Sequence, residues 1–149
     1  MKVPPKDRLH MSKVQELVEP NEIAVLGSSL RAIDQKILKP GYESGIRRIW
    51  YQGEEPYFDV FFDLKNNEIL WFQFTLRGHC LSWDVKHQEW QTGATNELKL
   101  DDVKYYPASK TIETDHKVDW AFISLVKSIL QIRAADDPLF AKALKLFMY

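Results

Sequence analysis

The hydrophobic period that decides the fold lies in residues 57–85, which read YFDVFFDLKNNEILWFQFTLRGHCLSWDV. Apolar residues recur at every second position from Phe58 to Leu64 and again from Leu70 to Leu76. A repeat of two residues is typical of β-strands, because successive side chains point to opposite faces of the sheet. This stretch therefore predicts strands that each have one apolar face and one more polar face.

The turn between the first two of these strands fits two alternatives. A two-residue loop at Asn66-Asn67 would place polar side chains opposite apolar ones. A three-residue loop that also includes Glu68 pairs Phe62 with Phe72 and Val60 with Phe74. We choose the three-residue loop, because a slip of one residue would bury the aspartates of the first strand.

The next turn is expected at Gly78-His79. Glycine at the first central position suits a type II′ hairpin, which needs positive φ there. This turn would pair Leu76 with Leu81 and Phe74 with Trp83, so that apolar residues face apolar residues. Shorter segments around Ile49 and after Trp90 extend the predicted series to about five strands.

Helical periodicity precedes the strands. Asn21 can cap a helix whose apolar residues recur at steps of three and four, namely Ile23, Leu26, Leu30, Ile33 and Ile37. We expect this helix to end at Lys39-Pro40-Gly41, where a basic side chain, a missing N–H group and a flexible backbone coincide.

Two further helices are expected after the strands. Asp115 is the expected cap of a strongly apolar helix containing Val118, Trp120, Phe122, Leu125, Val126, Ile129 and Leu130. Its polar stripe comprises Ser124, Lys127, Ser128 and Gln131. Asp137 followed by Pro138 is a typical start of a last helix.

Together these patterns predict an α+β fold, in which an antiparallel β-meander carries N- and C-terminal helices packed mainly on one face. A length of 149 residues fits a single domain spanning residues 1–149. Residues 1–10, which include Pro4-Pro5, are expected to form a loose N-terminal arm.

Composition narrows the classes of partner. The chain has 20 basic and 21 acidic residues, so no overall field attracts nucleic acid, and the pair Arg47-Arg48 is too small for a basic stripe. Neither a secretion signal nor a membrane-spanning run is recognisable. The single cysteine is typical of a reducing compartment. We therefore expect a soluble, cytoplasmic protein that binds neither nucleic acid nor a membrane.

Catalytic signatures are weak, so whether the protein is an enzyme stays open, with a non-catalytic role favoured. His79 and Cys80 are adjacent, and adjacent strand side chains point to opposite faces, which disfavours a cysteine nucleophile. His87 and Glu89 lack the spacing of a zinc site. We expect no catalytic residue, no metal and no cofactor.

The more polar sheet face is the candidate functional surface. It carries large aromatic side chains among charged ones, a pattern of binding surfaces but also of ordinary cross-strand packing. Both interpretations stay open. The candidate binding residues are Arg48, Trp50, Asp59, Phe61, Trp71, Gln73, Arg77 and Asp84.

The function expected from this face is binding of a protein partner, as in an adaptor, inhibitor or chaperone, with a second copy of the chain among the candidates. Tryptophan, tyrosine and arginine are the residues that dominate binding energy at interfaces. The alternative is a small-molecule-binding protein or enzyme with a pocket on the same face, lined by apolar walls and a few polar groups.

Overall fold

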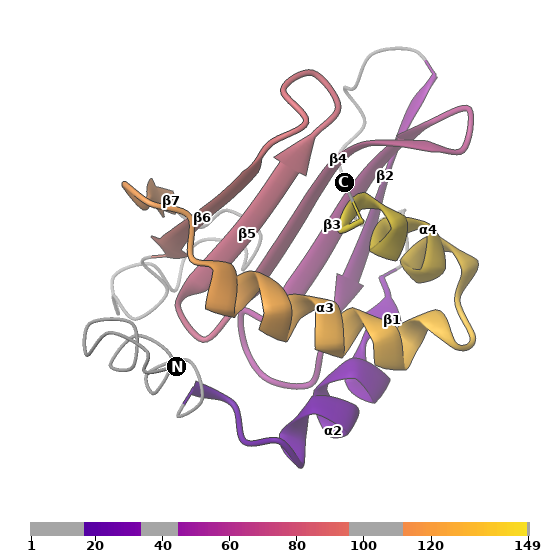
Figure 1. Cartoon of the computed structure of the whole chain (residues 1–149). Helices are drawn as coiled ribbons and strands as arrows, with labels where there is room; N and C mark the ends of the chain where they lie inside the picture. The colour runs from indigo at the N-terminus through magenta and orange to yellow at the C-terminus, as the bar shows by residue number, and fades with distance from the viewer. Residues whose placement is uncertain (1–16, 34–44, 96–111, 149) are drawn as a thin grey trace. The chain divides into compact units, whose positions relative to one another are not determined.

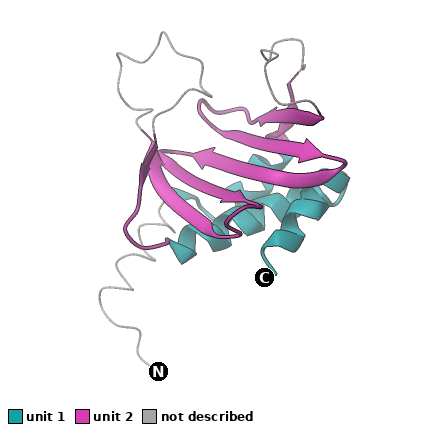
Figure 2. Ribbon diagram, turned by 90° about the horizontal axis from the view of Figure 1, so that it is seen from above, with its two compact units in different colours: residues 1–28, 119–149 teal, residues 29–118 magenta. Residues whose placement is uncertain are grey.

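The computed structural model describes residues 17–33, 45–95 and 112–148 (Figure 1). Two compact units are distinguished, residues 1–28 with 119–149 and residues 29–118 (Figure 2). The predicted single domain and the predicted packing of helices on one sheet face concern both units and stay predictions. The expected N-terminal arm and the expected helix end at Lys39-Pro40-Gly41 lie outside the described residues.

The sheet belongs to the second unit and confirms the α+β class and its antiparallel meander. Its described strands run in sequence order, each antiparallel to the next. They are β1 (Arg31–Ala32), β2 (Ile46–Gln52), β3 (Asp59–Lys65), β4 (Glu68–Leu76), β5 (His79–Asp84), β6 (Trp90–Thr95) and β7 (Ile112–Thr114). The expected five strands are thus corrected to seven among the described residues, because a short strand lies at each edge.

The β3–β4 hairpin confirms the expected strand pairing but not the expected loop. Phe62 lies opposite Phe72 and Val60 opposite Phe74, as predicted. The loop itself contains two residues, Asn66-Asn67, with φ of 52° and 65°, as a type I′ turn requires. A register shift next to Leu64 absorbs the extra residue, so a two-residue turn is compatible with the apolar pairing.

The β4–β5 hairpin corrects the predicted turn at Gly78-His79. The turn residues are Arg77 and Gly78, with φ of 48° and 84°, and Leu76 pairs with His79 instead of Leu81. The register therefore differs from the expected one by two residues. Because side chains alternate with a period of two, every residue keeps its predicted face.

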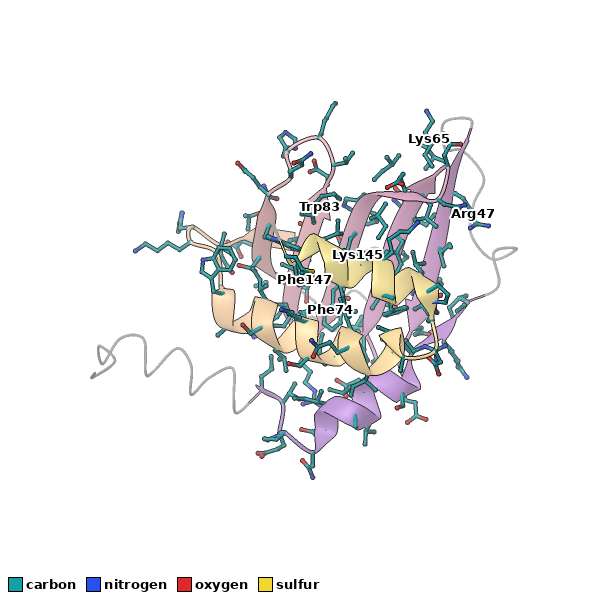
Figure 3. All side chains as sticks on the ribbon, turned by 45° about the vertical axis from the view of Figure 1, so that its right-hand side comes forward. Arg47, Lys65, Phe74, Trp83, Lys145 and Phe147 are labelled. Atoms are coloured by element: carbon teal, nitrogen blue, oxygen red, sulfur yellow. The ribbon has the colours of Figure 1, made fainter. Side chains whose placement is uncertain are left out.

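The apolar face of the sheet is buried as predicted. Phe74 of β4 is fully buried on this face, and Trp83 of β5, which pairs with Phe72, is half-buried (Figure 3). The other fully buried strand residues on this face are Val60, Phe62, Phe72, Leu76 and Leu81.

The expected helix that starts at Asn21 is corrected after Ser29, and its positions beyond Ile33 lie outside the described residues. Helix α2 (Glu22–Ser29) is followed at once by β1. Ala32 pairs with Tyr51, and the backbone N–H of Ile33 donates to the carbonyl of Trp50 over 2.8 Å. Pairing with β2 therefore overrides the helical period after residue 29.

Helix α3 (Trp120–Ala134) starts later than expected. Its N-cap is Asp119, whose carboxylate accepts from the N–H of Phe122 over 3.0 Å. Asp115, the expected cap, instead accepts from the hydroxyl of Thr92 over 2.8 Å. As a result Trp120, expected in the apolar stripe, is 64% exposed on the side of Ser124 and Lys127.

Helix α4 (Pro138–Leu146) begins as predicted, with Asp137 as N-cap. Phe140 and Ala143 form its buried side. Helices α2 and α3 approach each other closely at Gly27, where an added Cβ would lie 2.6 Å from the Cβ of Ile132. No helix among the described residues is long and apolar enough to cross a membrane.

Candidate functional site

The more polar sheet face, here called the polar face, is defined by three rows of cross-strand neighbours. One row contains Arg48, Asp63, Trp71 and Asp84; the second contains Trp50, Phe61, Gln73 and Ser82; the third contains Gln52, Asp59, Thr75 and Cys80. All predicted site residues except Arg77 lie in these rows. The structure therefore brings them together on one face.

Aromatic rings form a ladder across β2, β3 and β4. Trp50 stacks on Phe61, with ring centroids 5.7 Å apart and planes 15° apart. Phe61 in turn lies 6.3 Å from Trp71 with its ring tilted by 35°. Such offset pairs stabilise a sheet beyond the area that they bury.

Arg48 connects this ladder to the charged side chains of the first row. Its guanidinium carbon lies 4.7 Å from the Trp71 ring centroid and 5.8 Å from that of Phe61. The same group donates to both carboxylate oxygens of Asp63, over 2.8 and 3.0 Å. A planar, two-point ion pair fixes the guanidinium in one orientation. Arg48 and Asp63 are therefore held rigidly at the edge of the ladder.

The centre of the polar face is buried, so three candidate binding residues serve the fold. Asp59 is fully buried, and Trp50 and Phe61 are 8% and 4% exposed. The indole N–H of Trp50 donates to Asp59 over 2.8 Å. For these residues the structure favours cross-strand packing, the second of the two interpretations left open by the sequence.

Arg77 does not join the polar face. It lies in the β4–β5 turn, and its guanidinium donates to both carboxylate oxygens of Glu55, over 2.8 and 3.0 Å. Glu55 belongs to the β2–β3 loop, where Tyr57 has φ of 63° and its carbonyl accepts from the hydroxyl of Thr75. Arg77 thus fastens that loop to the turn. Opposite charge is the only sequence signal that could have suggested Glu55 as its partner.

Asp84 is the β5 member of the first row and the last residue of that strand. Its carboxylate accepts from the backbone N–H of His87 over 2.7 Å and contacts the imidazole Nδ1 over 2.9 Å. The backbone hydrogen bond from His87 is the main reason that the pKa of Asp84 lies below its ordinary value, and desolvation opposes the shift. Asp84 is therefore ionised at neutral pH.

The accessible part of the polar face is smaller than the predicted site. We take it as the half-buried side chains of the first two rows, namely Arg48, Asp63, Trp71, Gln73, Ser82 and Asp84. Asp63 and Ser82 were not among the predicted binding residues, although strand alternation places both on this face. We call these six residues the exposed row.

Other charged groups of the sheet lie apart from the exposed row. Arg47 points to the opposite face from Arg48 and lies at the same end of the sheet as Lys65 (Figure 3). Within the described ranges, no three His, Cys, Asp or Glu side chains are arranged to hold a metal ion.

In comparisons with known proteins, no family model, no curated protein and no solved structure matches this chain.

Proposed function

We propose that the protein binds a protein partner through the exposed row of the polar face. The observation that carries this proposal is the half-buried indole of Trp71, whose ring centroid lies 4.7 Å from the guanidinium carbon of Arg48. Tryptophan and arginine are the residues that most often dominate binding energy at interfaces. A second copy of the chain is one such partner.

The rigidity of the exposed row supports binding. Arg48 is fixed by Asp63 through two hydrogen bonds, and Trp71 is fixed by Arg48 and Phe61. Side chains that are already ordered lose little conformational entropy when a partner binds, so more of the contact energy contributes to affinity. The proposal retains the expectation that the helices cover the apolar face, which leaves the polar face for the partner.

The small-molecule alternative is less well supported. The lining expected for its pocket is Trp50, Asp59, Phe61, Gln73, Arg77 and Asp84. The first three of these side chains are buried against their own neighbours. The cytoplasm is the proposed location, because Cys80 is the chain's only cysteine and a disulfide within the chain is therefore impossible.

A differential capture experiment tests the proposal. Tagged wild-type protein, Trp71→Ala and Gln73→Arg are incubated with native lysate, and the purified chains are also sized. We expect the proteins retained by the wild type, or its self-association, to be lost in both variants. Trp120→Ala is the matched control, because it removes another exposed indole outside the polar face.

Circular dichroism establishes that each variant is folded before capture. Equal retention and equal size for the wild type, Trp71→Ala and Gln73→Arg would contradict the proposal. Loss of the same partners by Trp120→Ala would contradict it too, because the binding surface would then lie elsewhere.

A further inference from the structure

The two sides of the Trp71 indole differ. Its ring contacts come from the β3 side, where Phe61 lies 6.3 Å away and Arg48 reaches over from β2. On the other side, β5 places Asp84 directly opposite Trp71 in antiparallel register. Residues opposite each other in such a pair have Cβ atoms about 4.5–5.5 Å apart. Trp71 and Asp84 are therefore cross-strand neighbours on the polar face.

Charges in the exposed row are unequally matched. Arg48 and Asp63 neutralise each other through their two-point ion pair. Among the described residues, the Asp84 carboxylate contacts the imidazole of His87, and no lysine or arginine side chain of that part of the chain forms an ion pair with it. The Asp84 side chain is 40% exposed. A carboxylate offers about four acceptor positions, so Asp84 can accept further hydrogen bonds.

We infer that the partner of the exposed row presents a lysine or arginine side chain, which lies between the Trp71 indole and the Asp84 carboxylate. This inference rests on the function proposed above and adds the chemistry of the partner. A cation gains from the negative face of an indole and from the carboxylate at once. A neutral or acidic side chain at the same place would gain from neither.

The groups around Asp84 fit this assignment. His87 lies in the following turn and contacts the carboxylate from that side, and Lys86 donates a backbone hydrogen bond to it. On the neighbouring strand β4, Trp71 lies opposite Asp84. On the next strand, β3, Asp63 lies opposite Trp71 and is paired with Arg48. On the side facing Trp71, the positive side chain present is that of Arg48, whose guanidinium is paired with Asp63.

A titration with small probes tests the inference without knowledge of the partner. Isotope-labelled protein is titrated with N-acetyl-arginine amide, and in parallel with its neutral analogue N-acetyl-citrulline amide, by NMR. We expect saturable shifts at the Trp71 indole N–H and the Asp84 amide. The citrulline probe should bind about fivefold more weakly, since it lacks the charge.

Two variants and their controls make the result specific. Asp84→Asn and Trp71→Leu should each reduce arginine-probe binding to the level of the citrulline probe. Asp136→Asn and Trp120→Leu, which change an exposed aspartate and an exposed tryptophan of the helical unit, should leave it unchanged. Absence of saturable shifts, equal binding of both probes, or unchanged binding by Asp84→Asn overturns the inference.

The capture experiment separates this inference from the proposed function. If partners are lost by Trp71→Ala and Gln73→Arg while the probes show no preference for a cation, the cationic partner is wrong and the binding surface stands. If capture is insensitive to both substitutions, the proposed function itself fails.

Discussion

Asp59 is a charged residue that serves the fold from within the polar face. It is fully buried, and its carboxylate accepts from the indole N–H of Trp50 over 2.8 Å. The indole also stacks on Phe61. A buried donor and acceptor that satisfy each other cost little, whereas a buried polar group left alone is expensive. The same bond therefore explains why both residues can be buried on a face that alternation identifies as polar.

Replacing Asp59 should destabilise the fold. In Asp59→Ala the indole N–H of Trp50 loses this acceptor, and we expect a loss of about 1–3 kcal/mol in the free energy of unfolding. Urea unfolding measures it. Asp136→Ala, in the exposed turn between α3 and α4, should change stability by less than about 0.5 kcal/mol. Equal midpoints for the two variants would show that the Trp50–Asp59 bond is not structural.

Asp84 should make the stability of the fold depend on pH. Its pKa is lower in the folded protein than in the unfolded chain, mainly because of the backbone hydrogen bond from His87. A lowered pKa contributes stability above the unfolded value of about 3.9, and this contribution is lost as the pH falls through the folded value. The stability difference between wild type and Asp84→Asn should therefore shrink below about pH 4.

Carboxyl-resolved NMR measures the Asp84 pKa directly, and urea unfolding at several pH values gives the stability difference. The effect should be small, because the side chain is partly exposed. A folded pKa at or above the ordinary value, or a stability difference that grows with acidity, would disagree with the hydrogen bonds at this turn.

At the scale of elements, alternation predicts which face a side chain occupies, and turn geometry sets the register. The alternating pattern therefore predicts the faces of β3, β4 and β5 correctly, whereas the β4–β5 turn lies one residue earlier than predicted. The turn uses Arg77 with φ of 48°, which is unfavourable for a long side chain. Its bidentate pairing with Glu55 of a distant loop holds it there, and no local pattern reveals that contact.

Gly78 tests the turn. Its φ is +84°, and no described heavy atom outside its immediate neighbours lies within 4 Å of an added Cβ, so alanine would meet a conformational cost alone. We expect Gly78→Ala to lose about 1–2 kcal/mol in the free energy of unfolding. Gly78→Asn should lose less, because asparagine tolerates the left-handed region better. Unfolding curves in which both variants match the wild type would rule out the Arg77-Gly78 turn.

Helix boundaries also depend on contacts that local sequence preferences do not reveal. Asp115 and Asp119 both satisfy the sequence preference for an N-cap. The strand residue Thr92 binds Asp115, and α3 therefore begins after Asp119. The consequence is an exposed indole at Trp120, where hydrophobic periodicity alone predicts a buried one. The contact between Thr92 and Asp115, which are far apart in sequence, thus accompanies the late start of α3.

At the scale of the whole molecule, the net charge is only −1, so no strong overall electrostatic field selects a partner. The choice of partner therefore depends on local surfaces. Strand alternation predicts which side chains lie on the polar face. It does not predict which of those side chains are buried. Burial of Trp50 and Phe61 depends on how the rings stack across strands, which needs the register. The exposed row is what remains for a partner, with Trp71 at its centre.

Oxidative footprinting of tryptophan side chains tests this central claim most directly. Purified protein and protein returned to native lysate are oxidised with hydroxyl radicals, and the oxidation of Trp71 is divided by that of Trp120 to correct for scavenging. If the exposed row binds a partner, this ratio falls several-fold in the lysate. An unchanged ratio in a lysate where the wild-type chain captures protein would show that the partner binds elsewhere.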